Sequence, residues 1–213
     1  MQERSEAVYA LAQKAFRSFK ENSHAVNGPG QNLGAALLKD LRDPHVINPH
    51  LSAELVTCIV YQETATYLDP HDFNYSYCQN TPVMSSTAHG LGQITRGTFD
   101  FLHSVGHLPF TTVDVDRGIS RRNLFELMSG SVEMQIEAAM RILNFKIKDK
   151  VELKYKSKNK LLSAREAIMA GVYSYDQDNS SEYLNNVVNK CLPCMQTLKA
   201  SDTPYKCFGM GVK

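Results

Sequence analysis

The sequence lacks the long apolar runs and the one-sided charge that mark several large classes of protein. No apolar run approaches the roughly 20 residues that a membrane-spanning helix needs, so no membrane span is expected. The 213 residues carry a formal net charge of +1, and no large positive field directs the chain to nucleic acid. The first ten residues, MQERSEAVYA, have no apolar segment of the signal-peptide kind. The mature form of an exported protein would lack that segment too.

Cysteine is scarce, and its positions are unevenly spread along the chain: Cys58, Cys78, Cys191, Cys194 and Cys207. The cluster near the end indicates either an exported protein with a disulfide-pinned tail or free thiols in a reducing cytosol. A zinc site is disfavoured, because neither a second CxxC motif nor a nearby His pair is present. The odd count leaves at least one cysteine unpaired within the chain. We expect it to be Cys58, which lies inside an apolar run as a small hydrophobic residue.

Alternating patterns typical of strands are also scarce, whereas apolar residues recur at helical spacing along much of the chain. The composition, 43% hydrophobic and 21% charged, suits one compact domain with a sizeable core. We therefore predict a mostly α, single-domain protein. Helices are expected over residues 4–21, 33–42, 49–63, 95–105, 131–150, 163–172 and 180–191.

The clearest predicted helix covers the segment SVEMQIEAAMRILNFKIKDK. Ser131 can cap its start, and Glu137 can pair with Arg141 one turn later. One apolar stripe runs along it: Val132, Ile136, Ala139, Met140 and Leu143. This stripe predicts a helix packed against the core.

Local signals predict the start of one helix and the position of two loops. Asn48 can cap the helix of residues 49–63, with Pro49 as its first residue. The basic run KDKVELKYKSKNK, residues 148–160, is interpreted as a solvated loop. Residues 64–90 have a loop-like composition as well.

Glu63 is the first candidate for chemistry. It continues the apolar stripe of Val56, Ile59 and Val60, which lie on the same face of the predicted helix. Apolar surroundings raise the pKa of a carboxyl group, and such a group can then donate a proton near neutral pH. The alternative is a carboxylate at a helix end that reaches water or pairs with a lysine.

Two further segments carry groups suited to binding a sugar. SSTAHGLGQIT, residues 85–95, combines small residues and two glycines, which allow the backbone to approach a ligand, with the amide of Gln93. AIMAGVYSYDQDNSSEYLNNVV, residues 167–188, places Tyr173 and Tyr175 where a helix ends. The alternatives are a plain glycine turn for the first segment and core packing of the tyrosines for the second.

Taken in order, these segments resemble the soluble lytic transglycosylases, relatives of goose-type lysozyme. The family's apolar helix ending in Gln-Glu-Ser is matched by Pro49, Leu51, Leu55, Ile59, Gln62, Glu63 and Thr64. Its Ser, Gly-Ala, Gly-Leu-Met-Gln block is matched by Ser86, Ala88, Gly90, Leu91 and Gln93. Its two later helices are matched by Val132, Glu133, Ile136, Ala138 and Ala139, and by Tyr173, Tyr183 and Val187. The resemblance covers about residues 47–190.

The resemblance implies an α+β lysozyme-like domain with a glycan-binding groove over residues 46–190. A helical extension, 1–45, would precede it, and a tail, 191–213, would follow. It implies cleavage of the β-1,4 bond between N-acetylmuramic acid and N-acetylglucosamine in peptidoglycan. Glu63 would act as general acid and then as general base, forming a 1,6-anhydro product.

The resemblance also implies the residues that bind substrate: Thr64, Ser86, Gly90, Gln93, Tyr173 and Ser174. Tyr173 would lie near Glu63. No cofactor is expected, and no metal either, because His103 and His107 are interpreted as a surface pair. The protein would be an exported monomer, periplasmic or extracellular, acting on glycan strands.

Several positions depart from the family pattern. Gly92 replaces a methionine, and we expect its missing side chain to open part of a sugar subsite. Ser174 replaces an asparagine, and Tyr175-Asp176 replaces Ala-Gly. These changes suggest a preference for a modified glycan, such as an N-deacetylated one.

A lysozyme-type hydrolase needs a second carboxylate. The candidates for it are Asp69, Asp72, Asp100 and Asp176, of which Asp176 is the best placed. The alternatives to a transglycosylase are therefore a hydrolase and a wall-binding module with reduced activity.

Overall fold

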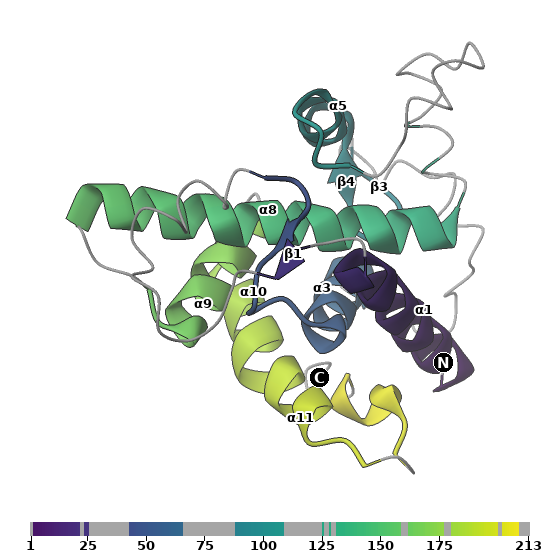
Figure 1. Cartoon of the computed structure of the whole chain (residues 1–213). Helices are drawn as coiled ribbons and strands as arrows, with labels where there is room; N and C mark the ends of the chain where they lie inside the picture. Colours follow the sequence, from purple (N-terminus) through teal and green to yellow (C-terminus); the bar gives the residue numbers. More distant parts are fainter. Residues whose placement is uncertain are drawn as a thin grey trace.

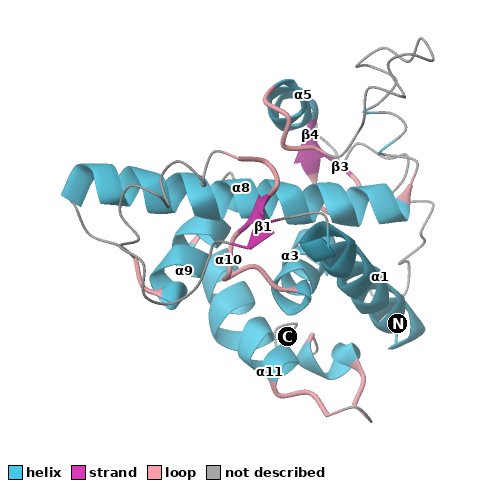
Figure 2. Cartoon of the chain, viewed as in Figure 1, coloured by secondary structure: helices cyan, strands magenta, loops and turns pink. Residues whose placement is uncertain are grey.

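Helices make up most of the described chain, so the predicted mostly α fold is confirmed (Figures 1 and 2). The computed structural model describes residues 2–21, 24–25, 43–65, 88–108, 125, 128, 131–158, 162–176, 180–199 and 202–208. The longer helices are α1 (Gln2–Glu21), α3 (Ala53–Ala65), α5 (Arg96–Ser104), α8 (Val132–Lys158) and α9 (Ala164–Tyr175). Near the C-terminus follow α10 (Ser181–Leu184), the π-helix η1 (Asn185–Cys191), α11 (Leu192–Gln196) and the 3₁₀-helix η2 (Pro204–Cys207).

Two pairs of very short strands accompany the helices. β1 (His24–Ala25) pairs in parallel with β2 (Val46–Ile47). β3 (Ala88–His89) pairs antiparallel with β4 (Ile94–Thr95), and the turn between them is residues 90–93. In the described residues, no helix combines the length and the apolarity needed to cross a bilayer.

The long helix α8 lies between two hydrophobic clusters. In Figure 1, α5 and the β3–β4 hairpin lie on one side of α8, and α1, α3 and α9 lie on the other. Ile136 and Met140 of α8 belong to the larger cluster with α1, α3 and α9, whereas Ala138 and Ile142 pack against α5. Burial on two sides explains why apolar residues occupy so much of this helix.

The local predictions for α8 are confirmed at its start and wrong at its end. The Ser131 hydroxyl accepts a hydrogen bond from the Met134 amide at 3.3 Å, and Arg141 pairs with Glu137 at 2.9 Å. The helix then continues to Lys158, so residues 148–158 of the basic run are helical and not a loop. It contains neither Gly nor Pro, and Lys, Glu and Leu are good helix formers.

Lys148, from this basic run, is buried. Its ammonium group donates hydrogen bonds to the carbonyls of Asp43, at 2.6 Å, and Val46, at 3.1 Å. A charged side chain is buried at lower cost when its donors are paired in this way. Lys148 therefore ties α8 to the segment that leads into α3.

The predicted start of α3 is wrong by several residues. The helix begins at Ala53, and the Ser52 hydroxyl accepts from the Leu55 amide at 3.2 Å. Asn48 is buried one turn earlier, where its side chain accepts from the His50 amide at 2.9 Å. The Asn48 side chain thus closes a local turn instead of capping the helix. The predicted helix at 33–42 and most of the predicted loop at 64–90 lie outside the described residues.

The described segments at both ends of the chain pack into the larger cluster. Val8, Ala12 and Phe19 of α1 lie in this cluster with residues of α3 and α8. At the other end, the Phe208 ring stacks on Tyr61 of α3, with ring centroids 3.9 Å apart. The helix that carries Glu63 is therefore covered from both termini.

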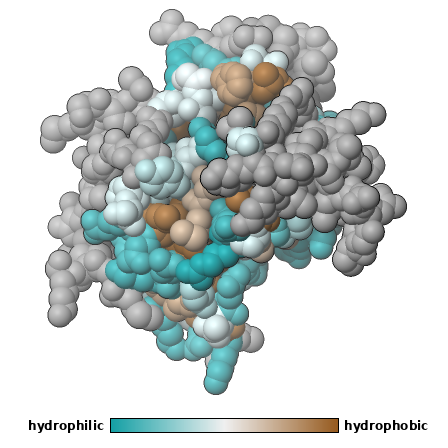
Figure 3. All heavy atoms as spheres, turned by 90° about the vertical axis from the view of Figure 1, so that its left-hand side faces the viewer, coloured by the Kyte–Doolittle hydropathy of each residue, from teal (hydrophilic) through white to brown (hydrophobic). Residues whose placement is uncertain are grey.

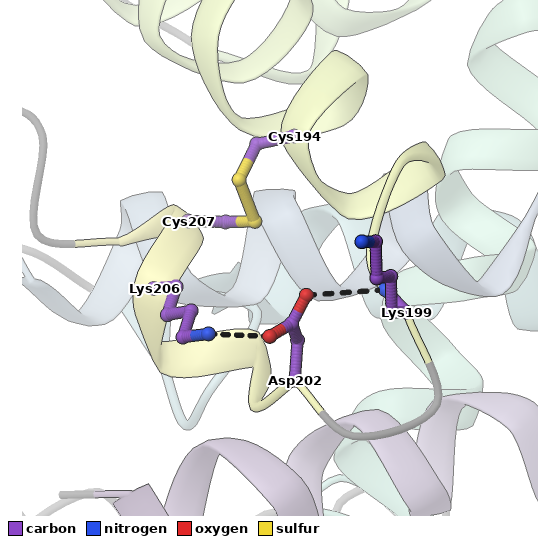
Figure 4. A network of polar contacts seen from close by, with 5 residues as sticks. All are labelled: Cys194, Lys199, Asp202, Lys206 and Cys207. Atoms are coloured by element: carbon purple, nitrogen blue, oxygen red, sulfur yellow. Dashed lines mark hydrogen bonds and ion pairs between the residues drawn. A yellow bond between two sulfur atoms is a disulfide. The ribbon is translucent and has the colours of Figure 1, made fainter.

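Two disulfides cross-link the chain, Cys58–Cys191 and Cys194–Cys207. The expectation that Cys58 is unpaired is wrong, because α3 directs this buried residue toward η1. The second disulfide closes the tail onto α11, and Asp202 bonds to Lys199 and Lys206 beside it (Figure 4).

The surface exposes few large apolar side chains among the described residues. These are Phe101, Val105 and Tyr173. On the coloured part of the face in Figure 3, small apolar areas lie between polar ones.

Candidate functional site

Glu63 lies in the last turn of α3 as a half-buried carboxyl group with a tyrosine partner. The Tyr183 hydroxyl donates a hydrogen bond to its Oε1 at 2.6 Å. Burial raises the pKa of Glu63 to about 7; the Tyr183 hydrogen bond lowers the pKa and the charge of Asp176 raises it, both less strongly. At neutral pH, therefore, the protonated and ionised forms are both populated.

The apolar face of α3 explains this burial. Leu55, Ile59 and Val60 are all fully buried in the larger cluster, and Glu63 continues their direction one turn later. The sequence-based expectation of a raised pKa is therefore supported, since burial is its largest cause.

Tyr175 is the second tyrosine of the site. Its hydroxyl donates to the Gly92 carbonyl at 2.9 Å, which ties the end of α9 to the β3–β4 turn. Burial, and then the negative charge of Glu63, raise the pKa of Tyr175 well above its usual value, and the same two causes lead for Tyr183. Both phenols remain protonated at neutral pH and act as hydrogen-bond donors.

The turn of residues 90–93 has a fixed backbone. The Gly90 carbonyl accepts from both the amide and the side-chain Nε2 of Gln93, at 3.0 and 2.9 Å. Gly90 and Gln93 have positive φ angles, 73° and 45°, and a Cβ at Gly90 would lie 2.6 Å from the Gln135 side chain. Gln135 in turn accepts from the Leu91 amide at 2.8 Å, so α8 holds the turn in place.

Gly92 is required by close packing. A Cβ there would lie 2.8 Å from Cβ of Ala139 and 3.0 Å from the Tyr175 hydroxyl. The expectation that Gly92 opens a sugar subsite is therefore wrong. Tyr175 and Ala139 fill the place that a side chain would take.

Asp176 and Ser180 position the segment that carries Tyr183. The Asp176 carboxylate accepts from the Ser180 amide at 2.7 Å. The Ser180 hydroxyl then caps α10 by accepting from the amides of Glu182 and Tyr183, both at 3.2 Å. A carboxylate that acts on Glu63 thus also helps to fix the helix of its tyrosine partner.

The structure brings some of the predicted residues together and not others. Gly90 and Gln93 form the turn that Tyr175 links to the Glu63 region. Tyr173 is 44% exposed, and it points about 200° away from Tyr175 around α9. Ser174 is half-buried on the same helix. Ser86 and the side chain of Thr64 lie outside the described part of the chain.

Sequence reasoning missed the roles of Tyr175, Tyr183 and Gln135. The signal for the first was the spacing in YSY, since two tyrosines two apart cannot face the same way on a helix. Tyr183 was matched only as part of a closing helix. Gln135 carried no signal, because its partner is a backbone amide 44 positions earlier.

His107 is not on the surface, so the expected surface pair with His103 is wrong. It is 7% exposed, and its ring lies edge-on to Phe145 with ring centroids 4.9 Å apart. Burial, followed by the charge of Lys148, lowers its pKa to about 4. The ring is therefore neutral at physiological pH.

The described fold and site together define a mostly helical protein in which a half-buried carboxyl group accepts a hydrogen bond from a tyrosine. Comparison with known proteins gives no match: no family model, no curated protein and no solved structure is significantly similar to this chain.

Proposed function

We propose that this protein cleaves the glycan strands of peptidoglycan at the bond between N-acetylmuramic acid and N-acetylglucosamine, with Glu63 as general acid and base. The observation that carries the proposal is the Glu63 carboxyl, whose pKa burial raises to about 7. A general acid works best when its pKa lies near the working pH. The order of the sequence segments, which resembles the soluble lytic transglycosylases, supplies the substrate class.

In this proposal, protonated Glu63 gives its proton to the glycosidic oxygen as the bond to C1 breaks. The resulting carboxylate then takes the proton of the muramyl 6-hydroxyl, whose oxygen attacks C1. The product carries a 1,6-anhydro ring, and no water is consumed. Between the two proton transfers Glu63 is ionised, and the Tyr183 hydroxyl stabilises this carboxylate by donating a hydrogen bond to its Oε1.

A lysozyme-type hydrolase is the second candidate, favoured by Asp176. This carboxylate is near enough to raise the pKa of Glu63 by its charge, and it could activate a water. The two reactions differ in their products. Mass spectrometry of the digest would show anhydro-muramyl ends for the first and fragments about 18 Da heavier, one water, for the second.

The proposed substrate preference is a modified glycan, such as an N-deacetylated strand. It rests on the sequence departures at Ser174 and Tyr175-Asp176, and no longer on Gly92, because Ala139 and the Tyr175 hydroxyl occupy the place of a side chain there. Comparison of kcat/KM on normal and N-deacetylated peptidoglycan tests this preference, and equal values would exclude it.

Export to the periplasm or the cell exterior is part of the proposal. The two disulfides support it, because disulfides persist mainly in oxidising compartments. The peptidoglycan substrate lies in those same compartments.

Glu63→Gln is the decisive variant, and Glu182→Gln is its matched control. Both changes remove one carboxylate, but Glu182 is exposed on α10, and the contacts that hold its place, to Ser180 and Asn185, are made by its backbone. We expect Glu63→Gln to lose at least about a thousandfold in wall-clearing rate while binding to sedimented wall is retained. Glu182→Gln should clear walls at the wild-type rate. Clearing that survives Glu63→Gln would exclude this mechanism, and if the wild type bound walls without clearing them, the wall-binding alternative would hold.

A further inference from the structure

Two contacts join α3 to the segment formed by α10 and η1. One is the Cys58–Cys191 disulfide, with Cα atoms 5.8 Å apart. The other is the hydrogen bond from Tyr183 to Glu63. Cys58, the earlier of the two α3 residues, meets the later residue of the other segment, whereas Glu63 meets the earlier one. The two segments therefore run in opposite directions.

The spacing of these contacts does not match on two α-helices. Cys58 and Glu63 are five residues apart, which corresponds to about 7.5 Å along an α-helix. Tyr183 and Cys191 are eight residues apart, which corresponds to about 12 Å. With both segments α-helical, a disulfide at one end would leave Tyr183 well past Glu63.

The π-helix reduces this mismatch. In η1 the Leu192 amide donates to the Val187 carbonyl, five residues earlier, so each turn contains more residues than an α-helical turn. More residues per turn give a smaller rise per residue, which brings Tyr183 closer to the level of Glu63.

The π-helix also changes the direction of the side chains. Residues four apart drift by about 40° per step around an α-helix, and wider turns reduce that drift. Tyr183, Val187 and Cys191 are spaced by four, and all three are buried in the larger cluster. They therefore form one line toward α3, with the disulfide at one end and the hydroxyl at the other.

We propose that the π-helical segment Asn185–Cys191 and the Cys58–Cys191 disulfide act together as a positioning device that holds the Tyr183 hydroxyl on Glu63. Cys58, Cys191 and η1 touch no substrate; they act through Tyr183. The catalytic meaning of this device depends on the function proposed above, but the device itself concerns only the Glu63 carboxyl. π-Helical turns are rare and occur frequently at functional sites.

The test is a titration of the Glu63 carboxyl by carbon-13 NMR on the full chain. Tyr183→Phe sets the reference: loss of a hydrogen bond to the ionised form should raise the midpoint by about one pH unit. The double variant Cys58→Ala/Cys191→Ala should shift it upward by at least half of that amount. The matched control, Cys194→Ala/Cys207→Ala, removes the other disulfide and should leave the midpoint unchanged.

Two more variants make the test independent of any single one. Deletion of both Asn189 and Lys190, two exposed residues of η1, should turn the Tyr183 side chain by roughly 100° relative to Cys191 and raise the midpoint as Tyr183→Phe does. Tyr183→Phe added to the Cys58/Cys191 variant should cause only the remaining part of the shift, at most about half a pH unit, because the hydroxyl is already displaced. Equal effects of the two cysteine pairs, or a Glu63 midpoint unmoved by both Cys58/Cys191 removal and the deletion, would overturn the proposal. Activity assays do not enter this titration, so failure of the proposed function would appear separately, in the Glu63→Gln assay.

Discussion

The Glu63 carboxyl lies among groups that change its pKa in opposite directions. Burial raises the pKa most, the Tyr183 hydroxyl lowers it, and the Asp176 charge raises it. In the proposed reaction the carboxyl must both give and take a proton. A balance of this kind keeps the two forms close in free energy near neutral pH.

Asp176→Asn should lower the pKa of Glu63. The variant removes the negative charge, and its Oδ1 can still accept from the Ser180 amide, so the cap of α10 remains. At high pH a smaller fraction of Glu63 is then protonated. The alkaline limb of the kcat/KM profile should therefore move to lower pH, with activity at pH 8 falling roughly threefold. A pH profile of wild type and variant measures this effect. Glu182→Gln serves as the charge control, and an upward move of the limb in Asp176→Asn would contradict the prediction.

At this scale the sequence predicted the chemical character of one residue but not its partners. Glu63 could be recognised because its apolar neighbours are within one helical turn. Tyr183 lies 120 positions away in the chain, so its contact depends on how α3 and α10 pack. The pairing of Cys58 with Cys191, 133 positions apart, was hidden for the same reason.

At the scale of elements, helices α8 and α9 approach each other closely. A Cβ on Gly171 of α9 would lie 2.2 Å from Cγ1 of Ile147 and 3.1 Å from its Cα. A backbone atom cannot move aside as a flexible side chain can. The glycine therefore permits the contact that places the end of α9, and Tyr175 with it.

Gly171→Ala should destabilise the protein by about 2–4 kcal/mol, because the added methyl group separates α8 from α9. Gly97→Ala is the matched control: Gly97 is exposed on α5, and its Cβ would have no heavy atom within 4 Å. That change should stabilise by about 0.5–1 kcal/mol through helix propensity. Urea unfolding of the three proteins measures both values, and equal effects of the two substitutions would contradict the role given to Gly171.

Elements were predicted well where their signals are local. The Ser131 cap and the Glu137–Arg141 pair depend on residues within one turn, and both are present. The start of α3 was placed too early, since Asn48 and Ser52 are both suitable caps and only tertiary packing selects between them. The π-helical turns of η1 carry no recognised sequence signal, so their place could not be predicted.

At the scale of the whole molecule, the shifted pKa values of Glu63 and His107 have opposite effects on how stability depends on pH. Glu63 has a raised pKa of about 7, so the folded state binds its proton more tightly than the unfolded state does, and stability falls as pH rises from about 4.5 to 7. His107 has a lowered pKa of about 4, so stability from this group falls as pH drops from about 6.5 to 4. Each effect amounts to roughly 3 kcal/mol, and the two largely cancel over their shared range.

Single substitutions should therefore reveal a pH dependence that the wild type hides. Glu63→Gln leaves only the histidine effect, and its free energy of unfolding should fall by roughly 3 kcal/mol from pH 7 to pH 4 relative to wild type. His107→Gln leaves only the carboxyl effect, and its stability should rise by a similar amount over the same range. The titratable and charged groups around His107 are Lys148, Asp43, Arg141 and His45, and neither substitution changes them. The double variant should regain the flat wild-type profile, because the two sites lie in different parts of the core. Urea unfolding at half-unit pH steps measures the wild type, the two single variants and the double variant. A double variant whose stability changes with pH as steeply as in either single variant would show that the two effects do not oppose each other.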